Sequence, residues 1–284
     1  MKGFDNIGNT CYLNAGLQLL IQNRDLCNIV LSFKDKINIL KIVAKLIEEY
    51  YNDKKCSINP IEIKKLVTSR NRIFNGFQQQ DSSEFIIFFL DLLNNEINKI
   101  IPNKNLLDKI YELQITTSTK CKVLECLTVS TNNELSTMLM LEVNSECNTL
   151  DDCYRISKQK IKLEGDNKYY CEKCKKKRIA SQKKEITKWP KNLIIFLRRF
   201  NQTGSRMSKF SQEIKVPIEW RHDYKLKGVV YHSGSLHGGH YVYAGLDIIQ
   251  NGKWRLFNDS SVSELSNNAL ANIVNNGYIY YFTK

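Results

Sequence analysis

A single cysteine stands at the start of an apolar run near the N-terminus. In the stretch GNTCYLNAGLQLLIQ, Cys11 lies between Thr10 and Tyr12. Unpaired cysteines are among the most buried residue types, so packing in the core is one interpretation. The other is a nucleophile, because a thiol at a helix N-terminus lies at the positive end of the helix dipole, which stabilises the thiolate. This second interpretation predicts a lowered pKa for Cys11 and needs a base elsewhere in the chain.

Histidine is scarce, with four residues, and three of them fall in YHSGSLHGGHYVYAG. A general base must reach the nucleophile and be oriented by a third group. His240 is the candidate, because an expected strand follows it and would anchor it, whereas His232 and His237 are expected at ordinary loop positions. Gly238 and Gly239 precede it and have no side chains, so a substrate chain can lie close to the backbone there.

A possible orienting group for this histidine lies in KWRLFNDSSVSEL. Asn258 and Asp259 fall at an expected strand end, before a Ser-rich turn. An amide or carboxylate there could accept the second ring N–H of His240 and fix its tautomer, although a capping turn is the alternative. The order Cys11, His240, Asn258 is that of papain-like cysteine proteases, which carry a Cys-His-Asn triad.

Four cysteines form two close pairs in the middle of the chain. Cys171 and Cys174 lie in KYYCEKCKKK, and Cys121 and Cys126 lie in STKCKVLECLTV. Two thiolate pairs are what a closed, structural zinc site requires, and four residues between the upstream cysteines leave a longer loop around the metal. The pattern predicts a zinc ion that holds two hairpins together. Vacant pairs or buried thiols are the alternative interpretation.

The elements that must position these residues change in type along the chain. Helical spacing of apolar residues predicts helices behind Cys11, over about 37–47, and in the stretch QDSSEFIIFFLDLL, where Asp81 can cap the helix and Glu84 can reach back to it. From about residue 111, β-branched and alternating runs predict strands. Helices first and strands later indicate an α+β fold with helices on one side of an antiparallel sheet. No repeat or Pro-rich linker divides the chain, so we expect one domain with an insertion.

The composition is that of an ordinary globular protein, with 284 residues, 42% hydrophobic and 25% charged. The net charge of +13 comes from lysines spread along the whole length, so we interpret KCKKKRIASQKK as a solvated hairpin face rather than a nucleic-acid site. Nine cysteines are an odd number, and neither a signal-peptide pattern nor an apolar run of membrane-spanning length is found. These features argue against a disulfide framework and predict an intracellular protein, cytoplasmic or nuclear.

Several long motifs in one fixed order resemble the catalytic domain of ubiquitin-specific proteases. GFDNIGNTCYLNAGLQ resembles that family's cysteine box, and HSGSLHGGHYVYAG with WRLFNDSSVSEL resembles its histidine box. QQQDSSEF resembles its glutamine-aspartate stretch, and WPKNLIIFLRRF the strand that enters its palm. The resemblance runs from Gly3 to Phe282. It implies a papain-like fold with a helical thumb, an antiparallel palm and zinc-bearing fingers, in a single domain over 1–284 with the fingers inserted at about 111–190.

The resemblance also implies roles for single residues near the proposed nucleophile. Cys11 would be the nucleophile, His240 the general base and Asn258 its orienting partner. Asn6 matches the side chain that stabilises the oxyanion, and Asp259 matches a second acidic position that supports the triad.

Further residues would bind the substrate and the metal. Asp81 and Glu84 correspond to residues that contact the extended, arginine-containing tail of ubiquitin, although helix capping is a competing role for both. Gly238 and Gly239 would form a narrow channel that admits a Gly-Gly tail. The zinc ligands would be the members of the two cysteine pairs, Cys121, Cys126, Cys171 and Cys174.

The implied reaction is hydrolysis of the bond after the C-terminal glycine of ubiquitin, through an acyl-enzyme thioester. Partners would be ubiquitin and ubiquitinated proteins, and zinc would be structural, with no catalytic cofactor. We expect a monomer with neither a membrane nor a nucleic-acid partner, and no accessory domain. The alternatives are a protease for a ubiquitin-like modifier, a catalytically silent ubiquitin-binding module and a zinc-containing nucleic-acid binder.

Overall fold

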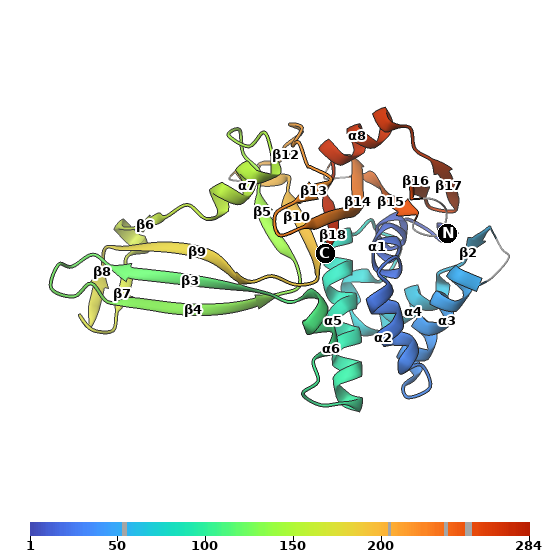
Figure 1. Ribbon diagram of the computed structural model, residues 1–284, viewed down its shortest axis with the longest axis horizontal. Coiled ribbons are helices and arrows are strands. Elements are labelled where there is room, and N and C mark those ends of the chain that lie inside the picture. The colour runs from blue at the N-terminus through green and yellow to red at the C-terminus, as the bar shows by residue number, and fades with distance from the viewer. Residues whose placement is uncertain (53–55, 204–205, 236–237, 248–251) are drawn as a thin grey trace.

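The first 111 residues fold into a helical lobe, the thumb (Figure 1). The computed structural model describes residues 1–52, 56–203, 206–235, 238–247 and 252–284. The thumb helices are α1 (Cys11–Ile21), α2 (Arg24–Ser32), α3 (Asn38–Asn52), α4 (Ile61–Arg70), α5 (Ser82–Ile100) and α6 (Leu106–Tyr111), with a 3₁₀ turn at Arg72–Phe74. Every residue of α1 is buried, so this helix forms the centre of the lobe. The predicted helices behind Cys11, near 37–47 and after Asp81 are confirmed as α1, α3 and α5.

The second lobe, the palm, is an eight-stranded sheet. Its strand order is β17-β16-β15-β14-β18-β10-β5, with β13 paired to β14. The strands are β5 (Leu139–Glu142), β10 (Asn192–Arg198), β13 (Glu219–Trp220), β14 (Tyr224–Gly234), β15 (Gly239–Asp247), β16 (Lys253–Asn258), β17 (Ser261–Glu264) and β18 (Ile279–Thr283). All neighbours are antiparallel except β10 and β5.

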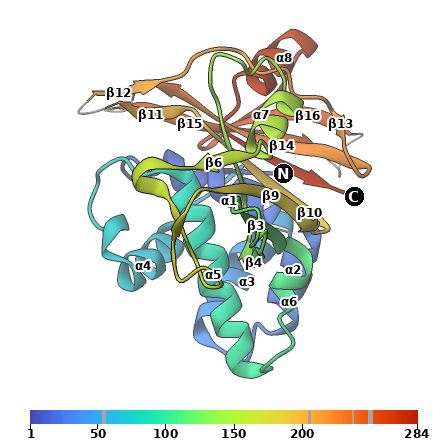
Figure 2. The same cartoon turned by 90° about the vertical axis from the view of Figure 1, so that its left-hand side faces the viewer.

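The palm sheet is covered on both faces, whereas the sequence predicts helices on one side only. Val230 and Ile194 pack into a core shared with the thumb. Their strand neighbours Val229 and Ile195 pack into a second core with α7 (Leu150–Ser157) and α8 (Asn267–Asn275). Apolar residues on both faces of a strand require cover on both sides, which is why runs such as NLIIFL do not alternate with polar residues. Figure 2 shows the thumb helices below the sheet and α8 above it.

The fingers extend from the junction of the two lobes as a long, twisted sheet (Figure 1). This sheet has the order β4-β3-β9-β6. Its strands are β3 (Leu113–Cys121), β4 (Val129–Ser136), β6 (Ile161–Leu163) and β9 (Ala180–Lys188), and the hairpin of β7 (Tyr169–Cys171) and β8 (Lys176–Arg178) follows a short 3₁₀ turn at Gly165–Asn167. Between β4 and β6 the chain returns to the palm as β5 and α7. The expected insertion at about 111–190 therefore contains a palm strand.

Two small pairings complete the fold. Strands β1 (Gly3–Phe4) and β2 (Ser57–Ile58) pair in parallel, and β11 (Phe200–Thr203) pairs with β12 (Arg206–Lys209). Phe4 also donates its N–H to the carbonyl of Asp259 at 2.9 Å, which ties the N-terminus to the end of β16. Within the described ranges, no helix combines the length and apolar character needed to cross a membrane.

A buried arginine at the end of β10 generates a prediction about stability. Arg199 is 2% exposed, and its guanidinium donates to the carbonyls of Gly277 (2.8 Å), Gln212 (2.7 Å) and Asn275 (2.9 Å). Because one buried and two half-buried carbonyls lose their donor, Arg199→Ala should lower the free energy of unfolding in urea by about 3 kcal/mol.

The preceding arginine is the matched control for this measurement. Arg198 is exposed and pairs with Glu142 at the surface, so Arg198→Ala should cost less than about 1 kcal/mol. Equal destabilisation by the two substitutions would contradict the structural role assigned to Arg199.

Candidate active site

The loop that enters α1 places Cys11 at the first turn of the helix. The Asn6 side-chain oxygen accepts the N–H groups of Gly8 at 3.1 Å and Thr10 at 3.2 Å, so it folds this loop back on itself. The Thr10 hydroxyl in turn accepts the N–H of Ile7 at 3.0 Å. These local contacts fix the direction in which α1 begins.

The thiol of Cys11 lies in the contact between thumb and palm. Its residue is 3% exposed, and burial raises the pKa of the Cys11 thiol. The backbone N–H of Tyr241, at the start of β15, acts in the opposite direction, and the nearby charge of Asp259 raises the pKa further. The prediction of a lowered pKa is therefore wrong, because desolvation exceeds the stabilisation that the helix start and the Tyr241 N–H supply.

His240 and Asn258 are joined by a hydrogen bond of 2.7 Å between Nε2 and Oδ1. They lie at the start of β15 and the end of β16, where the pairing of these strands stops. An amide oxygen accepts, so this contact places a proton on Nε2 and leaves Nδ1 as the basic nitrogen of a neutral ring. In the described part of the chain, no hydrogen bond joins this ring to the Cys11 thiol.

Asp259 connects the catalytic candidates on the two lobes. Its carboxylate accepts the side-chain N–H of Asn6 at 2.9 Å and that of Asn14 at 2.7 Å, and it lies 3.9 Å from Nε2 of His240. The structure thus brings together all five residues that the sequence assigns to catalysis. Asn14 was missed, although a polar residue inside the apolar run of α1 was its signal, because a buried amide needs hydrogen-bond partners.

Asp81 caps α5 and holds two palm tyrosines. One carboxylate oxygen accepts the N–H groups of Ser83 and Glu84 and the Ser83 hydroxyl, and the other accepts the hydroxyls of Tyr241 at 3.1 Å and Tyr278 at 2.6 Å. These donors occupy the acceptor sites of a carboxylate. Glu84 does not reach back to the Asp81 N–H among the described contacts. Partial burial and the charge of Asp81 raise the pKa of Glu84.

The two glycines before His240 differ in their surroundings. A Cβ at Gly238 would meet nothing closer than Gln79 Oε1 at 4.0 Å, which leaves open space beside the backbone. A Cβ at Gly239 would collide with His232 Nε2 at 2.2 Å, so this glycine serves packing. His232 was expected in a loop but is buried on β14, and burial lowers its pKa to about 4. His237 lies outside the described residues.

A residue that the sequence analysis overlooked contacts the second of these glycines. The Gln79 side chain donates to the Gly239 carbonyl and accepts the Gly239 N–H, both at 2.9 Å. Its only signal in the sequence was its place in the run QQQD, two residues before Asp81.

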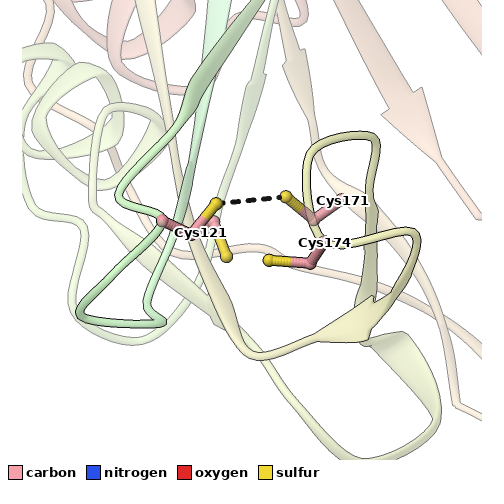
Figure 3. Close-up of side chains that lie close together, drawn as sticks. Cys121, Cys171 and Cys174 are labelled. Atoms are coloured by element: carbon pink, nitrogen blue, oxygen red, sulfur yellow. Dashed lines mark hydrogen bonds between the residues drawn. The ribbon is translucent and has the colours of Figure 1, made fainter.

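The two cysteine pairs meet at the fingertip (Figure 3). Cys121 ends β3, Cys171 ends β7, and Cys126 and Cys174 lie in the turns that follow these strands. The four sulfur atoms lie within 4.8 Å of one another, and Cys126 and Cys171 are 3.6 Å apart. The residue after the second cysteine of each pair has a positive φ, 44° at Leu127 and 50° at Lys175, so both turns fold back in the same way.

Three comparisons relate this chain to known proteins. It is 28% identical over 331 residues to ubiquitin carboxyl-terminal hydrolase Usp2 of Drosophila melanogaster, covering 99% of this chain and 34% of that protein. It is 27% identical over 362 residues to ubiquitin carboxyl-terminal hydrolase 4 of Saccharomyces cerevisiae (strain YJM789), covering 99% of this chain and 39% of that protein. The chain therefore spans between a third and two fifths of the length of these relatives.

A solved structure shares the fold. The SAGA DUB module of Ubp8, Sgf11, Sus1 and Sgf73 bound to monoubiquitin contains a chain that superposes with a TM-score of 0.86 at 23% identity, covering 100% of this chain and 69% of that one. The family model described as ubiquitin carboxyl-terminal hydrolase matches residues 2–282. The chain therefore belongs to the ubiquitin carboxyl-terminal hydrolase family.

Proposed function

We propose that this chain is the catalytic domain of a cysteine protease that hydrolyses the isopeptide or peptide bond after the C-terminal glycine of ubiquitin. The observation that carries the proposal is the site itself. A buried thiol at the start of α1 faces the start of β15, where a histidine is oriented by an asparagine at 2.7 Å. Membership of the ubiquitin carboxyl-terminal hydrolase family supports ubiquitin as the substrate.

The raised pKa of Cys11 determines how the reaction would begin. A neutral thiol must lose its proton as it attacks, and Nδ1 of His240 is the basic nitrogen that takes it. Sulfur then bonds to the carbonyl carbon of the terminal glycine. The departing amine takes the proton from His240 and leaves a thioester, and water activated by the same nitrogen releases free ubiquitin and restores the thiol.

Developing negative charge on the carbonyl oxygen needs donors that are already in place. Asn6 uses one side-chain N–H for Asp259, which leaves its second N–H for the oxyanion. Backbone N–H groups at the start of α1 supply further donors. Asp259 would support the triad by holding Asn6 in position beside Asn258.

The substrate tail would approach along the open backbone at Gly238, with Glu84 as an acceptor for its arginine. Asp81 would support this channel without binding the tail itself, because its acceptor sites are occupied by Ser83, Glu84 and the two tyrosines. The partners would thus be ubiquitin and ubiquitinated proteins, bound by a single domain that spans 1–284 with fingers at about 111–190. A monomer with an intracellular location stays a prediction.

The fingertip would hold one structural zinc ion. Zinc–sulfur bonds of about 2.3 Å in a tetrahedron separate the sulfurs by about 3.8 Å, close to the 3.6 Å between Cys126 and Cys171. Four cysteine sulfurs leave no open position for catalysis. Cys121, Cys126, Cys171 and Cys174 would therefore hold together the two turns that follow β3 and β7.

The proposed activity predicts a covalent adduct. Ubiquitin with a C-terminal electrophile should label the protein at one site, and Cys11→Ala should abolish the labelling, as followed by intact-protein mass. A probe built on a ubiquitin-like modifier should react at least about tenfold more slowly. Preferential reaction with such a probe would favour a protease for that modifier, and no reaction with either would leave a silent binding module.

The raised pKa of Cys11 predicts how the thiol responds to pH. The rate at which a small alkylating reagent modifies Cys11 should rise with pH and reach half its maximum above pH 9.0, the ordinary value for a thiol, because the thiolate becomes the main form only above the raised pKa. Near neutral pH only a slower reaction that needs a proton acceptor should remain. Peptide mass mapping would separate Cys11 from the other cysteines. A midpoint at or below neutral pH would mean that the thiolate is preformed.

The zinc proposal predicts stoichiometric metal. The purified protein should contain about one zinc ion per chain by elemental analysis, and both Cys126→Ser and Cys174→Ser should lose it and lower the melting temperature. Cys56→Ser is the matched control, because Cys56 is an exposed free cysteine away from this cluster. Full zinc content in both fingertip variants would contradict the assignment.

A further inference from the structure

A short segment of the thumb, residues 79–82, contacts the immediate neighbours of both the proposed nucleophile and the proposed base. Ser82 is fully buried, and its hydroxyl donates to the carbonyl of Tyr12, the residue after Cys11, at 2.9 Å. Its neighbour Asp81 accepts the hydroxyl of Tyr241, the residue after His240, at 3.1 Å. One segment is thereby connected to the chain beside each reacting group.

Gln79 adds a second connection on the other side of the base. Its side-chain amide forms two hydrogen bonds of 2.9 Å with the backbone of Gly239, the residue before His240. The segment therefore holds both chain neighbours of His240, Gly239 through Gln79 and Tyr241 through Asp81. Paired donor and acceptor contacts of this kind restrict both the position and the orientation of the peptide that they bind.

Strand geometry explains why the backbone of Gly239 is free to accept this contact. Pairing between β15 and β16 covers only Tyr243 to Asp247 on β15, so the outer edge from Gly239 to Tyr241 faces the thumb instead. Alternate residues of a strand direct their N–H groups to the same edge. The Tyr241 N–H reaches Cys11 on this edge, and the Gly239 N–H reaches Gln79 on it.

We propose that Gln79 is a positioning residue that fixes His240 opposite Cys11. Cys11 belongs to the thumb and His240 to the palm, so no short length of chain sets the separation of the two groups. Residues 79–82 connect the two groups across the lobes, because Ser82 is hydrogen-bonded beside the nucleophile and Gln79 and Asp81 are hydrogen-bonded beside the base. This inference rests on the proposed function. It also places Asp81 in the positioning segment, because the Asp81 carboxylate accepts hydrogen bonds from Ser83, Glu84 and the two tyrosines.

Gln79→Ala tests the inference with little risk to the fold, because the side chain is exposed. With a fluorogenic amide at the C-terminus of ubiquitin, kcat should fall about tenfold while KM stays within about twofold, because a misplaced base slows the chemical step. Gln79→Glu should be impaired as much, since a carboxylate cannot donate to the Gly239 carbonyl. Gln78→Ala is the matched control, because Gln78 is exposed and its side chain has no hydrogen bond within the described ranges; its kcat should equal that of the wild type.

A readout without ubiquitin separates this inference from the proposed function. Near neutral pH the Cys11 thiol is neutral, so its alkylation by chloroacetamide depends on His240 as proton acceptor and should be slower in His240→Ala. Gln79→Ala should fall to the His240→Ala rate, and Gln78→Ala should not. If the wild type fails to hydrolyse the ubiquitin substrate, the proposed function fails, and alkylation alone decides whether Gln79 positions the base.

Two outcomes would overturn the inference. An unchanged kcat together with an unchanged alkylation rate in Gln79→Ala would show that the hydrogen bonds between Gln79 and Gly239 do not position His240. A change in KM alone would show that Gln79 either binds the substrate, if KM rises, or occupies its place in the resting enzyme, if KM falls.

Discussion

The packing of α1 against the start of β15 is the contact on which the whole site depends. The proposed nucleophile comes from the first turn of one element and the proposed base from the first residues of the other, and the two elements pack into one hydrophobic core that thumb and palm share. Core packing sets the distance between the lobes only approximately, because apolar contacts are not directional. Directed hydrogen bonds then set the finer alignment, through Asp259 on one side of the site and residues 79–82 on the other.

Burial at this contact has a chemical consequence. The same packing that aligns Cys11 also removes it from water, and the desolvated thiol holds its proton more tightly than an ordinary cysteine. In the proposed reaction a thiol that keeps its proton must transfer it during the attack, so the alignment of His240 would matter at the moment of reaction. Asn258 contributes by leaving the basic nitrogen of the ring uncommitted.

The sequence was sufficient to predict which residues lie together at the candidate site, and less so their surroundings. Cys11, His240, Asn258 and the cysteine pairs were predictable because each lies in a motif whose residue types admit few functions. Contacts between distant segments determine the remaining features. These are the raised pKa of Cys11, the hydrogen bonds between Gln79 and Gly239, and the second helical layer of α7 and α8. The local spacing of residue types does not predict such contacts. The run QQQD, for example, reads as a polar loop, and only the structure places Gly239 beside it.

The protonation state of His240 in the resting protein tests the account most directly. Nitrogen-15 chemical shifts of the His240 ring at neutral pH distinguish the two neutral tautomers from the charged imidazolium. The contact with Asn258 Oδ1 predicts a proton on Nε2, and the proposed proton transfer requires that Nδ1 carries none. A proton on Nδ1, in the other neutral tautomer or in a charged ring, would contradict the account, because no base would remain to take the thiol proton.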